Sequence, residues 1–481
     1  MRFDVIIRYV GLVLLINAVF MLISALISIF NNWDTGSYPL LLSCAICAIA
    51  GIFPLIFVER NVQISTKEGY VIVVGSWLLS CVAGMLPYVL WGGEFSFINA
   101  WFESVSGFTT TGGTILEDIE ALPDGLLFWR SATHWIGGVG VVLFSLVILP
   151  TLGRTKVIMS NVELSSLAKE NFRYRTQKIL MILTVVYVGL TLLQTLLLKV
   201  AGMDWFDSIN HAFSTISTGG FSTKNMSIGA YNNIWIDIIC IIFMLIASIH
   251  FGLIFSTFIR NKNNIFRSEV VRFYIFGIIA MIICTMLNLK FSGNYETFGE
   301  ALRYGSFQIV SVISTTGFAT ANTNLWTPFA ILILIYCGFQ CGCAGSTTGG
   351  LKADRMLLLF KALKVRIIQQ QHPNAVVRVK LDGLSQENSL ISTVTLYIVL
   401  YLVLALAGGL LISLTGEDLL TSFSASYASL GNVGPGFGKV GSVDNFASLT
   451  VFAKMVCTML MLLGRLEIFG FIHLLFLHSW R

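Results

Sequence analysis

The sequence predicts an all-α polytopic membrane protein, built from pseudo-fourfold helix–short helix–loop–helix repeats with two extra helices at the N-terminus. Three observations predict this fold class. Of the 481 residues, 56% are apolar and only 11% are charged, which is too little charge to cover a soluble protein of this length. Apolar runs of about 20 residues, the length that crosses a bilayer core, follow one another along the chain. A loop rich in Ser and Thr and centred on glycine recurs between them.

The apolar runs define the expected membrane-spanning helices. They lie near residues 6–29, 38–58, 70–91, 126–150, 178–200, 232–259, 270–289, 326–343, 389–415 and 447–478. The first run is too long for the apolar part of a signal peptide, and no small-residue cleavage site stands out after it, so we expect a retained helix. All nine Cys residues lie in or beside apolar runs, where thiols behave as small hydrophobic groups, so we expect no disulfide framework.

Shorter semi-polar segments are too short or too polar to span the membrane, so we expect them to be re-entrant helices. They lie at 95–105, 205–216, 297–313 and 419–430. Each leads into a glycine-centred loop, and we call these the glycine loops, with central residues Gly112, Gly220, Gly317 and Gly434. The copies align without gaps, because nine residues before each glycine the short helices carry Glu103, His211, Gln308 and Ala425. The spacing of the glycines, roughly 100–115 residues, indicates an internal fourfold repeat.

The repeat spacing predicts how the chain is divided. A two-helix extension is expected at 1–62, followed by pore repeats at 63–160, 161–262, 263–372 and 373–481. The third repeat is expected to contain an additional intramembrane loop, and its second helix alone is expected to be broken by such a loop.

The placement of basic residues predicts the orientation. Lys and Arg gather in the segments 59–69, 151–178, 260–272 and 352–380. Because basic connections stay on the cytoplasmic side, we expect a cytoplasmic N-terminus and glycine loops that enter from outside. The acidic residues on the opposite side either raise the local cation concentration or only signal topology. The polar stretch 367–388 is either a docking surface or a plain linker.

The glycine loops have the composition of a cation site. Non-helical backbone at membrane depth survives only where it is buried in protein or lines a water-filled path. Carbonyl oxygens aimed at a common axis can replace the hydration shell of K⁺, and glycine allows the backbone conformation that this requires. One such loop could be a tight turn, but four at matching positions indicate a filter. The predicted filter residues are Thr110, Thr111, Gly112, Thr218, Gly219, Gly220, Thr315, Thr316, Gly317, Asn432, Val433 and Gly434.

A second polar loop, Gln340–Lys352, interrupts the helix expected over 326–370. A flexible segment of small residues at membrane depth must line a cavity. Two kinds of binding site have related patterns. A phosphate loop is disfavoured because Lys352 comes one place late and no strand is expected before it. A soft-metal site at Cys341 and Cys343 would need further ligands.

Arg465 lies within the last apolar run, where a charge is costly and usually faces the protein interior or a cavity. It could form a structural pair with Glu467, or it could act as a cationic barrier in a conduction path. His134 and Trp135 are expected to pack at a helix end rather than to carry protons.

The sequence resembles the TrkH/KtrB superfamily of potassium-uptake proteins, which is related to plant HKT transporters. The matching motifs are FESVSGFTTTG (102–112), HWIGGVG (134–140), STGGFST (217–223), STTGFAT (314–320), AGSTTGGLK (344–352), NVGPGFG (432–438) and GRLEIFG (464–470). The chain length and the extra N-terminal helices favour the TrkH branch.

The resemblance implies a potassium channel-like pore, a homodimer and a cytosolic TrkA-type nucleotide-binding ring. It places a gate below the filter, formed by Gly345, Ser346, Thr347, Thr348, Gly349, Gly350 and Arg465. It also implies that glycine at position 112 goes with K⁺ preference.

We therefore expect a K⁺-selective, channel-like uptake protein of the bacterial inner membrane, and not an enzyme. The alternative is a symporter that couples K⁺ to H⁺ or Na⁺. K⁺ is expected as the substrate ion, bound only at the filter. No covalent cofactor and no nucleic-acid partner are expected, and a nucleotide would act only through the partner ring. An intramembrane enzyme is disfavoured because His134, His250 and His473 show no recognised pairing.

Overall fold

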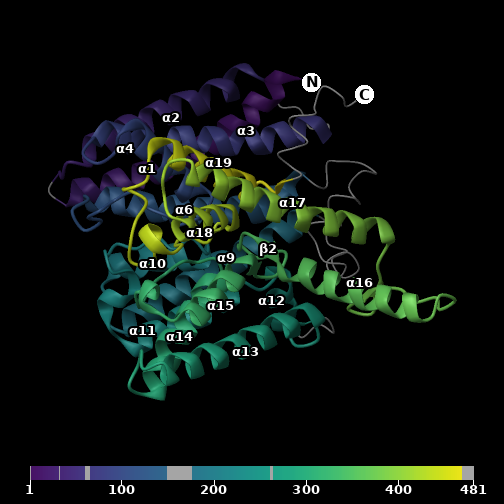
Figure 1. Cartoon of the computed structure of the whole chain (residues 1–481). Helices are drawn as coiled ribbons and strands as arrows, with labels where there is room; N and C mark the ends of the chain where they lie inside the picture. Colours follow the sequence, from purple (N-terminus) through teal and green to yellow (C-terminus); the bar gives the residue numbers. More distant parts are fainter. Residues whose placement is uncertain (1, 32, 60–65, 149–175, 260–263, 469–481) are drawn as a thin grey trace.

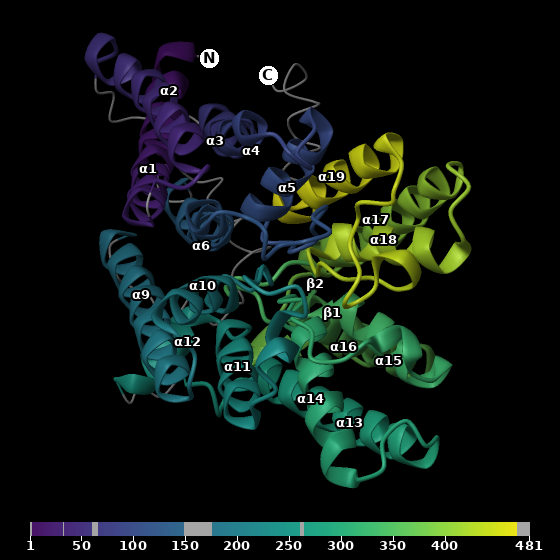
Figure 2. The same ribbon diagram turned by 90° about the vertical axis from the view of Figure 1, so that its left-hand side faces the viewer.

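The computed structural model describes the chain apart from residues 1, 32, 60–65, 149–175, 260–263 and 469–481. Its first part contains α1 (Phe3–Phe30), α2 (Ser37–Phe57), α3 (Thr66–Gly84) and the short α4 (Leu86–Trp91). Helices α1 and α2 lie at the edge of the molecule in Figure 2, away from the centre where the other helices converge. This is where an extension preceding the repeats is expected to lie.

Four short helices carry the loops that define the repeats. They are α5 (Phe97–Phe108), α10 (Trp205–Ile216), α14 (Phe298–Ile313) and α18 (Leu419–Gly431). Each begins in the same way, because an oxygen of the preceding side chain accepts a hydrogen bond from a backbone N–H of the first turn. These capping residues are Ser96, Asp204, Thr297 and Asp418. The predicted re-entrant helices are therefore confirmed as separate elements.

The longer helices surround these four. They are α6 (Asp124–Ile148), α9 (Thr176–Val200), α11 (Ile234–Ala247), α12 (Phe251–Phe258), α13 (Glu269–Phe291), α15 (Pro328–Phe339), α16 (Ala353–Gln371), α17 (Asn388–Ser413) and α19 (Val451–Arg465). In Figure 2 the short helices α5, α10, α14 and α18 are arranged around a common centre. Short 3-10 helices at Ser227–Tyr231, Thr323–Leu325 and Gly438–Val440 follow three of the glycine loops.

The structure is an all-α polytopic membrane protein. Among the described residues, six helices are long and apolar enough to cross a bilayer, or seven if the bent pair α11 and α12 forms one span. Large apolar side chains remain exposed along these helices, as lipid contact requires, with examples at Phe53, Leu196, Phe276 and Leu406. The basic residues expected over 151–178 lie almost entirely outside the described part of the chain, as do the last residues of the run 447–478.

At least two helices of the repeats are broken within the part of the chain that the structure describes. In the third repeat, α15 ends at Phe339 and α16 begins at Ala353, as predicted. In the second repeat, α11 and α12 meet at an angle of 101°, across Ser248–His250. The expectation that the third repeat alone would have a broken helix was incomplete.

The loop between α15 and α16 is closed at its base by a short parallel ladder. Strand β1 (Gln340–Cys341) pairs with β2 (Leu351–Lys352). The expectation that no strand would precede this loop was therefore wrong, although the strand has only two residues. After α16 the chain forms a hairpin of β3 (Lys380–Leu381) and β4 (Leu384–Ser385), which protrudes on the right in Figure 1. The positive φ of Asp382 and Gly383 gives this hairpin its tight turn.

Candidate functional site

The four glycine loops share one backbone conformation. The residue two places before each central glycine has a positive φ, between 51° and 55°, at Thr110, Thr218, Thr315 and Asn432. The central glycines have φ between 81° and 95°. The positive φ values recur at the same two positions of every loop. The backbone carbonyl groups of the four loops are therefore oriented alike, although their side chains differ.

The loops form a closed ring. A Cβ added at Gly112 would lie closer than 3.0 Å to the carbonyl oxygen of Gly219 in the second loop. The same relationship holds between Gly220 and Thr316, between Gly317 and Val433, and between Gly434 and Thr111. Each central glycine therefore abuts a backbone oxygen of the next loop, in the order one, two, three, four and back to one. The structure thus brings all twelve predicted filter residues together, and all the non-glycine members are buried.

The ring opens on one side into a hollow of about 160 Å³, which we call the vestibule. Its lining includes three of the central glycines, Pro435 of the fourth loop and the guanidinium-bearing Arg130. Acidic and amide side chains such as Glu117, Asp444 and Asn445 also line it. A cation could therefore reach the ring from this side past polar groups.

Each short helix braces the loop that follows it. In three repeats the residue nine places before the glycine does this. The carboxylate of Glu103 accepts from the Thr114 hydroxyl and the Ile115 amide, His211 Nε2 lies 2.9 Å from Ser222 Oγ, and Gln308 donates to Ala321 O at 2.9 Å. In the fourth repeat Ala425 has no polar side chain, and its neighbour Ser424 instead accepts from the Phe437 amide at 2.9 Å. The aligned positions therefore share a structural role in three of the four repeats.

His134 packs beside the ring. Its imidazole stacks on Phe221 with the ring centroids 4.0 Å apart and the planes 10° apart. The space where a Cβ of Gly219 would lie is filled by the same imidazole. The expectation that His134 packs is confirmed, but it lies in the interior of α6, not at a helix end.

The intramembrane loop lies against the ends of the short helices. The Gly349 amide donates to Thr315 Oγ1 at 3.1 Å, and the Thr347 hydroxyl donates to Ile216 O, the last residue of α10, at 3.0 Å. A Cβ at Gly349 would meet Gly431 O of α18. All six predicted gate residues of this loop therefore lie in a segment that is joined directly to three of the four repeats.

The break in the second repeat forms a socket for this loop. Cys343 N donates to Ser248 O at 2.9 Å, Phe251 N donates to Gly345 O at 3.2 Å, and the Thr347 hydroxyl also lies 3.3 Å from Ala247 O. These are backbone groups at the end of α11 and the start of α12 that a continuous helix would have satisfied internally. We call residues 247–251 the socket. Sequence reasoning missed it.

Arg465 reaches the loop from the fourth repeat. Its Nη1 donates to Thr347 O at 2.7 Å, and the side chain is 6% exposed. Its Nε and Nη2 have no hydrogen-bond partner among the described residues. Of the two alternatives for Arg465, the structural pair with Glu467 does not form, because the Glu467 carboxylate lies 2.8 Å from Arg355 Nη2 at the start of α16. Arg465 is the last residue of α19.

A phosphate loop and a soft-metal site both find little support in the contacts of the intramembrane loop. The hydroxyls of Ser346 and Thr347 bind backbone oxygens, and Thr348 Oγ1 lies 2.7 Å from Ser346 Oγ, so these groups are engaged within the protein. Cys341 and Cys343 are free thiols, and no cluster of three or more potential metal ligands occurs in the part of the chain that the structure describes.

The fold and the ring of glycine loops define a membrane transport protein for cations. The sequence model of the TrkH family, described as a cation transport protein, matches residues 41–478. The chain belongs to the TrkH family, which confirms the resemblance inferred from its motifs. A family of transport proteins also confirms that this chain is not an enzyme.

Individual relatives are similar along their whole length. The chain is 34% identical to the Trk system potassium uptake protein TrkH of Escherichia coli strain K12, over 100% of both chains. It is 33% identical to the TrkG protein of the same organism, covering 88% of this chain and 87% of the relative. The crystal structure of the potassium transporter TrkH from Vibrio parahaemolyticus matches with a TM-score of 0.90 and 32% identity, covering 100% of both chains.

Proposed function

We propose that this protein is a K⁺-selective, channel-like uptake protein whose filter is the ring of glycine loops. The observation that carries the proposal is the closed order of contacts, in which each central glycine abuts a backbone oxygen of the next loop. Backbone oxygens held at fixed spacing around an axis can replace the hydration shell of K⁺. The relatives named above are potassium uptake proteins, which supports K⁺ as the transported ion.

The membrane potential can drive entry without a coupled ion. Each 100 mV contributes about 2.3 kcal/mol per elementary charge, so an open path suffices for uptake. The C-terminal ends of the four short helices are directed at the ring, and their partial negative charge favours a cation there. No covalent cofactor takes part in this proposal.

The gate in this proposal is the intramembrane loop together with Arg465. The positions of these residues support this proposal. Thr347 and Gly349 form hydrogen bonds where the second and third glycine loops leave their short helices, and Arg465 donates a hydrogen bond to Thr347 O. A guanidinium with two donors free of partners among the described residues places a positive charge beneath the ring, and it would repel K⁺ until it moved.

We further propose a bacterial inner-membrane location, a cytoplasmic N-terminus and glycine loops that open to the outside. We also propose a homodimer and a cytosolic TrkA-type nucleotide-binding ring, through which a nucleotide would act. The relatives are named as parts of a Trk system, which supports a further component. The protruding hairpin after α16 is the proposed docking surface for this ring, since α16 leads directly from the loop to that hairpin.

Isotope flux into liposomes tests the function. Purified protein, with and without the partner ring, should take up ⁴²K⁺ and ⁸⁶Rb⁺ in preference to ²²Na⁺ when only a membrane potential is applied. Absence of K⁺ flux under both conditions would refute the proposal. Uptake that requires a proton or Na⁺ gradient would favour the symport alternative.

A further inference from the structure

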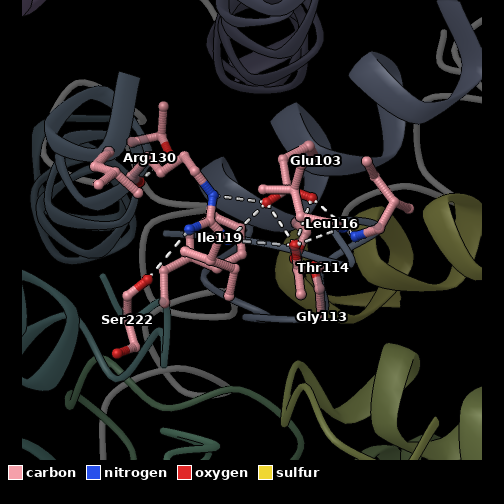
Figure 3. A network of polar contacts seen from close by, with 12 residues as sticks. Glu103, Gly113, Thr114, Leu116, Ile119, Arg130 and Ser222 are labelled. Atoms are coloured by element: carbon pink, nitrogen blue, oxygen red, sulfur yellow. Dashed lines mark hydrogen bonds and ion pairs between the residues drawn. The ribbon is translucent and has the colours of Figure 1, made fainter. Parts of the chain in front are cut away.

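Arg130 is a buried cation that joins the first two glycine loops, and sequence reasoning did not single it out. It belongs to α6, and its side chain is 1% exposed. Nη2 lies 3.3 Å from the Thr114 hydroxyl, and Nη1 donates to Ser222 O at 3.2 Å. Thr114 and Ser222 are equivalent residues, each two places after the central glycine of its loop. Figure 3 shows the guanidinium between them.

Two other contacts hold the guanidinium in this orientation. Nε and Nη2 both lie 2.8 Å from Oε1 of Glu103, which is fully buried in α5. The guanidinium carbon lies 4.1 Å from the centroid of the Phe221 ring, next to the second loop's central glycine. The planar guanidinium of arginine carries several N–H donors and can make these contacts at once. The ammonium group of lysine is a single point charge and cannot.

At the two neighbouring interfaces, hydrogen bonds between neutral groups link the segments next to the ring. Between the second and third loops, Gly229 N donates to Ala319 O at 3.0 Å. Between the fourth and first loops, Phe446 N donates to Thr114 O at 2.8 Å, and Asn432 Nδ2 donates to Thr111 Oγ1 at 3.0 Å. A guanidinium at the first interface is therefore a local feature that the fourfold arrangement does not require.

A positive charge is an unexpected lining for a cation vestibule. Arg130 lines the vestibule, where an unbalanced charge would repel cations. The Glu103 carboxylate compensates it at 2.8 Å, at the cost of burying two charges. A neutral bridge would have avoided that cost, so the feature that distinguishes this pair is the fixed geometry it gives to Thr114 and Ser222.

We propose that Arg130 is a positioning residue for ion selectivity. By holding Thr114 and Ser222, it sets the separation of the first two glycine loops, and thus the contact between Gly112 and the carbonyl oxygen of Gly219. Glu103 orients the guanidinium and cancels its charge toward the vestibule. The inference rests on the proposed function, because selectivity has meaning only if the ring conducts cations.

The test is a selectivity ratio measured on Arg130→Lys. Lysine keeps the charge and the pairing with Glu103 but cannot hold both loops. The ratio of ²²Na⁺ to ⁴²K⁺ initial uptake in liposomes should rise about tenfold, the size expected when a hydrogen bond to a charged group is lost. Thr114→Val keeps the ion pair intact and removes one end of the bridge, so its ratio should rise less. This second variant keeps the test valid if Arg130→Lys does not fold.

The matched control is Arg303→Lys. Arg303 Nε lies 2.6 Å from Asp237 Oδ2 and joins α14 to α11, away from the contacts that link the first two glycine loops. Its replacement should leave the ratio unchanged. If wild-type protein is selective and both Arg130→Lys and Thr114→Val keep the wild-type ratio, the positioning role is overturned while the proposed function stands. A wild-type protein without K⁺ flux would overturn the proposed function and this inference with it.

Discussion

Arg465, the last residue of α19, donates a hydrogen bond of 2.7 Å to the backbone oxygen of Thr347 in the intramembrane loop. The contact joins the fourth repeat to the third beneath the ring of glycine loops. Two residues later, Glu467 pairs with Arg355 at the start of α16. One short segment of the fourth repeat, Arg465–Glu467, therefore contacts both the intramembrane loop and α16, the helix that follows this loop.

Arg465→Ala should raise the basal uptake of ⁸⁶Rb⁺ in liposomes without the partner ring. The substitution removes both a positive charge beneath the ring and the bond to Thr347. The expected increase is about tenfold or more, because a hydrogen bond to a charged group contributes roughly 1.5–3 kcal/mol and about 1.4 kcal/mol corresponds to a factor of ten. Lys454→Gln is the control, since this buried cation of the same helix binds Asn99 and Ala447 instead. A decrease in uptake by Arg465→Ala would show that the arginine supports the structure of the path.

Thr347→Val should also raise basal uptake, through a different contact. The hydroxyl of Thr347 binds Ile216 O and lies near Ala247 O of the socket, and valine has the same shape without the hydroxyl. Loss of neutral bonds worth about 1 kcal/mol should weaken the closed loop and raise uptake roughly fivefold. Thr195→Val is the control, because this hydroxyl binds Thr191 O of its own helix. Equal uptake by both variants would argue against the socket as part of the gate.

Gly112→Ser should raise the uptake of Na⁺ relative to K⁺. A Cβ at this position would lie closer than 3.0 Å to the Gly219 oxygen, so that oxygen must move away from its place in the ring. The positive φ of Gly112 adds strain for any other residue. Gly189→Ser is the control, because an added Cβ there meets nothing within 4 Å. An unchanged ion preference in Gly112→Ser would mean that Gly112 is only a turn residue.

Asp418→Ala should lower the stability of the fourth short helix by about 1 kcal/mol, the usual contribution of an N-cap. Asp418 Oδ2 accepts from the Thr421 amide at 3.2 Å, and the hydrogen bonding with Thr421 holds the pKa of Asp418 below its usual value. Because the folded pKa is depressed, this stabilisation is present at neutral pH and is lost as the pH falls through that pKa. Melting temperatures in detergent should therefore differ between wild type and Asp418→Ala at pH 7, and the difference should shrink as the pH falls below the usual pKa of an aspartate. Asp418→Asn, which keeps a capping oxygen, should remain close to wild type at pH 7.

The periodic features of the fold could be predicted from the sequence. Apolar runs, short polar helices and four aligned glycines each reflect a local requirement, and the structure places them as expected. The positions of Glu103, His211 and Gln308 also aligned in the sequence, and each binds its own loop. The division of the chain into repeats at the expected boundaries stays a prediction.

The socket could not be predicted because its cause is not local. Ala247, Ser248, Ile249 and His250 include no glycine or proline that would signal a break. The bend is stabilised by the intramembrane loop, roughly a hundred residues further on, which binds the freed backbone groups. The absence of a pair between Arg465 and Glu467 could have been predicted, because residues two apart on a helix do not face each other.

The closed order of the glycine loops has a consequence for how selectivity can change. In a pore made of four identical subunits, one altered codon changes four positions at once. Here the four positions lie in one chain, and each glycine meets the backbone oxygen of a different residue: Gly219, Thr316, Val433 or Thr111. A single substitution therefore changes one contact between two neighbouring loops, and mutation can adjust the preference for an ion one such contact at a time.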